Sequence, residues 1–566
     1  MRLTQFRQRI THSAFLARLA SAASSIAFFG VIASPAIAGD KTTVCTITVN
    51  SPEEKEVFQR NLPEDKYQFV ELVEAGRPDW LAASCRKGVQ CDVLLISGHF
   101  DAGTEFYTDR LEQRESLAVE EMEKVACSDS CPGLFSHLKE VYLFGCNTLN
   151  GDAGESTPAE IARTLIRSGL PRGEAEQLSA ALDQRYGESN RDTMRRIFSH
   201  VPVIYGFSSL APLGPYAGGV LAKYFQAAPL AEIGSGMPSA SLLTHFAPTS
   251  MIAVGGLKDL ETRAPSRSQF CEFVDERTTI AAKVESVHRL LGRDMGESRM
   301  LFERVEKVTQ SLTADVRNTS DVAAAIDAVA ANRSAREQYL AYTRNTDRPE
   351  VRARMIKVAA ALGWLNPPEE RAELARAIAE QVAFDTVTVA DVDLACSLNR
   401  DGSLDIPQWR ALLPKSRLQR PANAGVLACL GSNDARIRVL QALTSTDVDD
   451  VHVAQVYLRH HPLTAAAELR GVTRNIARMP AADAQVRALE TLAQHRLSDR
   501  ETLDQLTRLF MLVRSLPVQR AIAGVLIRAD YALMSRPDVA RVLRQYRLKS
   551  PDGVDLIDVL IRRLLA

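Results

Sequence analysis

Short runs of β-branched and aromatic residues alternate with helical stretches over the first half of the chain, and this alternation is what most constrains the fold. The runs have the composition of buried strands and cover residues 43–49, 67–73, 93–97, 141–144 and 201–207. Ser51-Pro52 can open the first intervening helix, because the serine hydroxyl accepts from early helical amides. Strands separated by helices predict an α/β fold with a doubly wound, mostly parallel sheet.

The strand pattern ends near residue 266, and only helical spacing of alanine, leucine, arginine and glutamate continues. We predict an α/β domain over 39–265, a helical linker region over 266–346 and a helical repeat region over 347–566. Four helices of the last region share a local register around an arginine, at Arg352, Arg438, Arg487 and Arg520. This register resembles the inner-helix signature of HEAT repeats, which implies an extended surface for a substrate or protein partner. An irregular helical bundle is the alternative.

The first 38 residues have the layout of a signal peptide. Four arginines precede an apolar run at 26–33, and Ala36-Ile-Ala38 has the small-x-small form of a cleavage site. The run is shorter than the roughly 20 residues of a membrane-spanning helix, so an uncleaved anchor is the weaker interpretation. We therefore predict cleavage after Ala38, a periplasmic or secreted protein, and no integral membrane segment after cleavage.

Charge and cysteine content limit the function classes. The chain has 68 basic and 69 acidic residues, without the clustered basic surface of a nucleic-acid-binding protein. Nine cysteines are an odd number for an oxidising compartment, where thiols pair. We expect Cys85–Cys91, Cys127–Cys131, Cys396–Cys429 and Cys45–Cys271 as disulfides. That pairing leaves Cys146 alone.

Two of the predicted strands end in glycine followed by a reactive side chain: Val93-Leu-Leu-Ile-Ser-Gly-His99 and Val141-Tyr-Leu-Phe-Gly-Cys146. Ligands of open α/β sheets bind at the carboxyl ends of strands, so neighbouring parallel strands would bring the imidazole and the thiol to one edge. A histidine base can generate a thiolate nucleophile, and a helix starting after Cys146 would stabilise its charge. His99 and Cys146 are therefore a candidate catalytic dyad. The alternative is a structural histidine and a packed cysteine.

The residues around this pair resemble the caspase-like (clan CD) cysteine peptidases, most nearly the CHAT branch. Ile-Ser-Gly-His99 and Leu-Phe-Gly-Cys146-Asn-Thr-Leu-Asn-Gly151 are similar to the two catalytic blocks of that family, and the similarity covers about residues 42–230. The resemblance implies that Cys146 is the nucleophile, that His99 is the general base, and that the backbone amides of Cys146 and Phe100 form the oxyanion hole. It also implies a protein or peptide substrate.

Two departures from the family pattern keep other functions open. Phe100 stands where the family has glycine, and a positive φ there would be strained. A long segment before the fifth strand, 169–199, can also shape or occlude the cleft. The alternatives are a catalytically inactive envelope scaffold and an acyl transferase that uses the same dyad. Asp101 and Glu105 can orient His99 or favour a basic substrate, although such residues are more often solvated.

Nothing in the sequence predicts a cofactor or a metal site. The stretch 397–408 resembles an EF-hand loop, but glutamine occupies its twelfth position, where a bidentate glutamate is needed. The cysteines lack histidine or cysteine partners at zinc-finger spacing. No glycine-rich phosphate-binding loop is present either.

Overall fold

A computed structural model describes residues 41–100, 103–108, 115–128, 131–152, 157–227, 233–400, 402, 419–495, 497–549 and 555–565. The predicted signal peptide and most of the EF-hand-like stretch lie outside these residues. The α/β region contains a six-stranded sheet in the order β2-β1-β3-β6-β7-β8. The strands are β1 (Thr42–Thr48), β2 (Tyr67–Glu71), β3 (Val93–Ser97), β6 (Glu140–Phe144), β7 (Val203–Phe207) and β8 (Met251–Val254). The first five are mutually parallel and β8 runs antiparallel to β7, which confirms the mostly parallel sheet.

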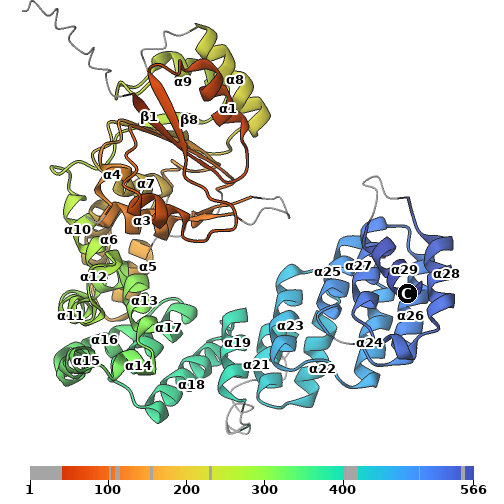
Figure 1. The fold of residues 1–566 in the computed structure, drawn as a ribbon. Helices are drawn as coiled ribbons and strands as arrows, with labels where there is room; N and C mark the ends of the chain where they lie inside the picture. Colours follow the sequence, from red (N-terminus) through yellow and green to blue (C-terminus); the bar gives the residue numbers. More distant parts are fainter. Residues whose placement is uncertain are drawn as a thin grey trace, which may run out of the picture. The chain divides into compact units, whose positions relative to one another are not determined.

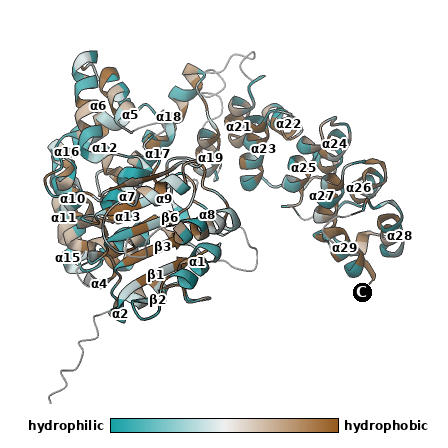
Figure 2. Cartoon of the chain, turned by 90° about the horizontal axis from the view of Figure 1, so that it is seen from above, coloured by the Kyte–Doolittle hydropathy of each residue, from teal (hydrophilic) through white to brown (hydrophobic). Residues whose placement is uncertain are grey.

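Each face of the sheet has its own apolar core, because alternate side chains of a strand point to opposite faces. Leu94, Ile96 and Val141 belong to one core, and Leu95 and Tyr142 belong to the other. Helices cover both faces (Figure 1), and the central strands β3 and β6 include hydrophobic residues (Figure 2) and are buried along their length. The first face is covered by α2 (Trp80–Arg86), α3 (Val119–Cys127), α4 (Pro132–Ser136) and α7 (Asn190–Ile197). The second is covered by α1 (Glu53–Asn61), α8 (Gly214–Ala227) and α9 (Ala240–His245).

The sequence did not predict three of the strands. The edge strand β8 is short and only partly buried, so it lacks the long apolar run of the central strands. The two-residue strands β4 (Glu105–Phe106) and β5 (Leu117–Ala118) pair with each other beside the carboxyl end of β3. Strands this short carry no periodicity from which they can be recognised.

Four disulfides are present, and three of them correct the predicted pairing. Cys396–Cys429 is confirmed, and Cys146 is the unpaired cysteine. The predicted pairs Cys85–Cys91, Cys127–Cys131 and Cys45–Cys271 are wrong. Spatial neighbours pair instead, across adjacent strands or packed helices: Cys45–Cys91, Cys85–Cys131 and Cys127–Cys271.

Helices follow the sheet, and the hydrophobic core that the first of these helices form also includes residues of the α/β region. These helices are α10 (Ala264–Val274), α11 (Ile280–Leu291), α12 (Met295–Met300), α13 (Phe302–Ser311), α14 (Ala314–Arg317), α15 (Ser320–Ala331), α16 (Arg333–Asn345), α17 (Pro349–Ala361), α18 (Pro367–Phe384) and α19 (Val389–Leu398). Two helices inserted before β7, α5 (Thr157–Arg167) and α6 (Arg172–Tyr186), contribute Ile161 and Leu182 to the same core. This core continues into α17 and α18 without a break at the predicted boundary after residue 346.

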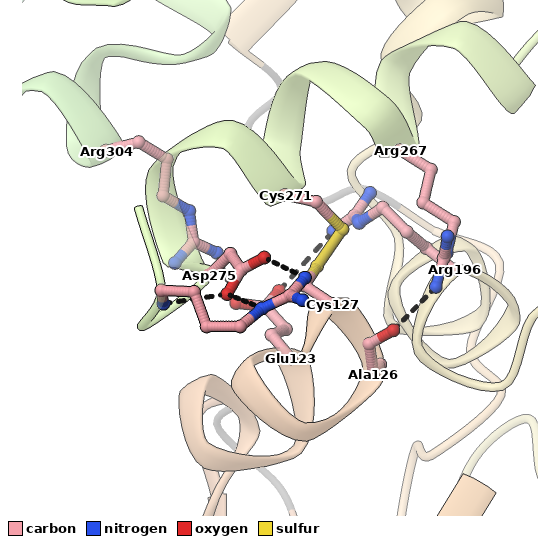
Figure 3. The surroundings of a disulfide bond; sticks show 9 residues. Glu123, Ala126, Cys127, Arg196, Arg267, Cys271, Asp275 and Arg304 are labelled. Atoms are coloured by element: carbon pink, nitrogen blue, oxygen red, sulfur yellow. Dashed lines mark hydrogen bonds and ion pairs between the residues drawn. A yellow bond between two sulfur atoms is a disulfide. The ribbon is translucent and has the colours of Figure 1, made fainter. Parts of the chain in front are cut away.

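Polar and covalent contacts join the sheet region to these helices. The Cys127–Cys271 disulfide connects α3 to α10, and Figure 3 shows Glu123 and the arginines Arg196, Arg267 and Arg304 around it. Glu123 is buried and accepts a 2.6 Å hydrogen bond from Arg304. The guanidinium groups of Arg196 and Arg304 lie 4.4 and 3.9 Å from the centroid of the Phe270 ring. Cation–π contacts of this kind add to a covalent link that closes a long stretch of chain.

The remaining helices pack in two series. They are α21 (Pro421–Cys429), α22 (Asn433–Ala442), α23 (Val448–His460), α24 (Ala466–Ala477), α25 (Ala482–Leu492), α26 (Arg500–Leu512), α27 (Leu516–Ile527), α28 (Arg536–Tyr546) and α29 (Leu556–Leu565). In one series α23, α25, α27 and α29 contact in turn, and in the other α22, α24, α26 and α28 do. Arg438 lies on α22, whereas Arg487 and Arg520 lie on helices of the other series. The shared arginine register therefore does not mark one layer of helices.

Helices dominate the described residues, but none of them combines the length and the apolar character that crossing a membrane requires.

Candidate functional site

The structure places His99 and Cys146 in one pocket at the carboxyl edge of the sheet. Strands β3 and β6 are parallel neighbours whose register pairs Ser97 with Phe144. His99 and Cys146 each lie two residues beyond this pair. Both line a small pocket of about 50 Å³. Its other walls come from the β1–α1 turn and from residues 211–214, before and at the start of α8. This is the juxtaposition predicted from the two strand ends.

The turn that carries Cys146 is fixed by buried contacts beneath it. The Thr148 hydroxyl is buried; it donates to the Gly145 carbonyl at 3.2 Å and accepts from the Phe207 amide at 3.0 Å. Asn147 has a φ of 59°, a left-handed conformation that asparagine tolerates better than most residues. At Gly145, a Cβ atom would lie 2.9 Å from the Gly98 carbonyl oxygen, so the two strand ends approach too closely for a side chain. These contacts explain structurally why glycine, asparagine and threonine occur next to Cys146.

The sulfur of Cys146 receives a backbone hydrogen bond, although not from the expected source. The Ala211 amide donates to Sγ at 3.3 Å from the segment that follows β7. The expectation that Cys146 lies at the foot of a helix is wrong, because residues 146–149 form turns. The next helix, α5, begins at Thr157, where the capping pattern Thr-Pro-Ala-Glu predicts a helix start. A backbone N–H aimed at the sulfur favours its negative charge, as the predicted helix start would have done.

Phe100 does not obstruct this site. It is not among the residues with positive φ, and only 1% of its surface is exposed. Its ring packs at 4.6 Å, centroid to centroid, against that of Phe106 in the core beneath the sheet edge. Within the described chain, no backbone acceptor is found for the amides of Phe100 and Cys146. Of these two residues Cys146 lines the pocket and Phe100 does not.

A buried carboxyl group that the sequence did not single out also lines the pocket. Glu54 is 2% exposed, and its Oε2 accepts hydrogen bonds from the hydroxyls of Ser51 at 2.6 Å and Ser97 at 3.1 Å. Burial raises the pKa of Glu54 above its usual value of 4.5. Its position in the first turn of α1 is typical of an acid that stabilises a helix start, so a role at the pocket could not be recognised from the sequence.

Other residues considered from the sequence lie away from the pocket. Glu105 is exposed on β4 and does not line it, and Asp101 is outside the described residues. His137 and His200 precede β6 and β7, at the opposite edge of the sheet, and His245 bonds the Ser241 carbonyl within α9. Described residues of the 169–199 segment form α6 and α7, and none of them lines the pocket. The expected occlusion by this segment is not found.

One cluster of potential metal ligands occurs among the described residues, far along the chain from this pocket. One ligand atom from each of Cys396, Cys429 and His461 lies within 4.8 Å of the others. The two sulfurs are bonded to each other, so neither is a thiolate that could ligate a metal ion. The cluster is therefore a disulfide beside a histidine in this structure.

In comparisons with known proteins, no family model matches this chain, and neither the curated proteins nor the solved structures include a significant match.

Proposed function

We propose that this protein is a cysteine peptidase of the caspase-like type, with Cys146 as nucleophile and His99 as general base. The observation that carries the proposal is the shared pocket of His99 and Cys146 at adjacent parallel strand ends, with the Ala211 amide donating to the sulfur. The sequence blocks around both residues add to it. Four disulfides favour an oxidising compartment, in agreement with export.

In the proposed reaction the imidazole of His99 takes the thiol proton, and the thiolate attacks the carbonyl carbon of a peptide bond. The amides of Cys146 and Phe100 hold the oxyanion that develops. When the carbon–nitrogen bond breaks, the protonated imidazole gives its proton to the leaving amine and a thioester on Cys146 results. Water, activated by His99, then hydrolyses the thioester and restores the free thiol.

Alkylation of the mature protein tests the dyad directly. We expect iodoacetamide to label Cys146 near pH 7 at least about tenfold faster than an unactivated thiol, because His99 and the Ala211 amide favour the thiolate. His99→Ala should slow this labelling, whereas His137→Ala, at the opposite edge of the sheet, should not. Mass spectrometry locates the label, and the other eight cysteines are protected as disulfides. Labelling at the rate of an unactivated thiol in all three proteins would refute the proposal.

Glu54 supports a preference for a basic side chain next to the scissile bond. Glu54 is the acidic residue among those described that line the pocket with His99 and Cys146, and the lining also includes the exposed apolar side chain of Leu213. A lysine or arginine side chain has an apolar stem that can pack on such a residue and a charged end that a carboxylate binds.

The pH dependence of this preference gives a second test. Below its raised pKa Glu54 is neutral, so the ratio of kcat/KM for lysine over glutamine peptides should rise as the pH increases from about 4.5 through that pKa. Glu54→Gln should lower kcat/KM for the lysine peptide about 10- to 100-fold and remove this pH dependence. The glutamine peptide serves as the control for general damage. An unchanged ratio in Glu54→Gln would assign the preference to other residues.

The helices from α21 to α29 support the HEAT-like part of the proposal. Successive helices of one series contact each other, and a parallel series packs beside it, as in solenoids of stacked helix pairs. We assign this region to binding of the protein substrate or of a protein partner. Deletion of it should then raise KM for a protein substrate more than for a short peptide.

A further inference from the structure

A second cavity, of about 490 Å³, lies among the helices that follow the sheet. It is bounded by the end of α5, the α16–α17 junction, the end of α18 and the segment that leads to α19. Three arginines line it: Arg167, Arg344 and Arg352. Its volume falls in the range of about 300–1,000 Å³ that is typical of small-molecule sites.

One of these arginines is buried, and two of its three guanidinium nitrogens, which carry three of its five N–H donors, have no hydrogen-bond partner among the described residues. Arg352 is 3% exposed, and its Nη1 donates to Glu380 at 2.5 Å. Its Nε and Nη2 are buried, and no described residue accepts a hydrogen bond from either. A charged donor buried in this way is unfavourable unless an acceptor is present.

Other arginines of this chain show what that guanidinium edge normally binds. Nε and Nη2 of Arg299 donate to the two oxygens of Glu160, at 3.0 and 2.6 Å. Arg436 binds Glu468 through the same two nitrogens, at 2.6 and 2.8 Å. The Nε–Nη2 edge therefore binds a carboxylate in both cases. Two parallel hydrogen bonds of this kind bind an oxyanion more strongly and more specifically than a single one.

We propose that the Nε–Nη2 edge of Arg352 binds the oxyanion of a small organic acid that enters this cavity. The two acidic residues of the lining are already engaged, since Glu380 pairs with Arg352 through Nη1 and Asp347 pairs with Arg163 and Arg167. Neither carboxylate bonds to the Nε–Nη2 edge of Arg352, whose two nitrogens are closed to solvent. The side chains of Arg167 and Arg344 are about half exposed at the cavity, but they pair with Asp347 and Glu373, so among the described residues the buried unpaired donors of this site are those of Arg352.

An apolar side chain at the cavity defines the rest of the ligand. Phe384, the last residue of α18, lines it and is 75% exposed. An exposed aromatic ring close to an arginine cluster fits a ligand that carries an apolar or aromatic body as well as the anionic group. The site therefore takes an aromatic or apolar carboxylate or phosphate in preference to the bare inorganic ion.

Binding measured by calorimetry on the full mature protein tests this site, with benzoate, phenyl phosphate and inorganic phosphate as probes. We expect benzoate or phenyl phosphate to bind more tightly than inorganic phosphate. Arg352→Lys keeps the charge but loses the planar edge, and it should weaken binding at least about tenfold. Phe384 is exposed, so Phe384→Ala should fold normally. It should lower the affinity for benzoate and phenyl phosphate but not for inorganic phosphate. Arg376→Gln, also on α18 but outside the cavity lining, is the control.

Several outcomes would overturn the inference. Binding of none of the three probes at millimolar concentration would do so, as would equal binding by Arg352→Lys that retains the thermal stability of the unmodified protein. A crystal soaked with phenyl phosphate that shows only water on the Arg352 edge would also exclude it. If Arg352→Lys does not fold, the Phe384→Ala comparison and the soaked crystal decide. The result is independent of the proposed peptidase, since Cys146→Ala should bind the probes unchanged.

Discussion

Cys146→Ala is expected to reduce peptide hydrolysis by on the order of 10³-fold or more, because it removes the nucleophile of the proposed acyl-enzyme. The measurement is kcat/KM for a fluorogenic peptide that the unaltered protein cleaves, chosen from a library with basic residues before the scissile bond. The fold should be little affected, since Cys146 is only half-buried and forms no disulfide. We expect its free energy of unfolding to change by less than about 1 kcal/mol.

The matched controls separate chemistry from folding. His99→Ala should give a loss of similar size, because residues that act as one unit are not additive, and the double variant should be no worse than either. His200→Ala, exposed and at the other edge of the sheet, should keep full activity. If Cys146→Ala kept more than a tenth of the activity, another group would be responsible for the hydrolysis. The interpretation of this domain as a scaffold would then be favoured.

Glu160→Ala is expected to destabilise the protein by about 3–5 kcal/mol, because it leaves a buried guanidinium without its carboxylate. Glu160 on α5 is 1% exposed and Arg299 on α12 is 6% exposed, and two hydrogen bonds join them. This pair connects the helical insertion of the sheet region to the helices that follow it. Urea unfolding and hydrogen exchange of the α5 and α12 amides would measure the loss.

Two further variants test this assignment. Glu272→Ala removes a carboxylate whose partner Arg289 is 56% exposed, so it should cost less than about 1 kcal/mol. Replacing both Glu160 and Arg299 by apolar residues of similar size should recover most of the stability lost in Glu160→Ala, because no unpaired charge stays buried. A loss below about 1 kcal/mol in Glu160→Ala would show that solvent reaches Arg299.

The sequence alone determined the central strands and the positions of the two proposed catalytic residues. Runs such as 93–97 are continuous and apolar because both faces of a parallel strand are buried, and that pattern can be read locally. His99 and Cys146 follow such runs directly, so placing the strands also placed both side chains at one sheet edge. The odd number of cysteines required one unpaired thiol, and the predicted pairing left Cys146 as that thiol although three of its four pairs are wrong.

Only the tertiary structure decided which residues far apart in sequence became neighbours. Cys45 pairs with Cys91 because β1 and β3 are adjacent in the sheet, whereas the predicted pairing joined Cys91 to its sequence neighbour Cys85. Ala211 and Glu54 reach the pocket from segments on either side of the two strands, and Arg352 is buried with its Nε and Nη2 unpaired within the described part of the chain. Local sequence patterns indicate which face of a helix or strand is buried. Which side chains contact each buried group depends on how elements distant in sequence pack together.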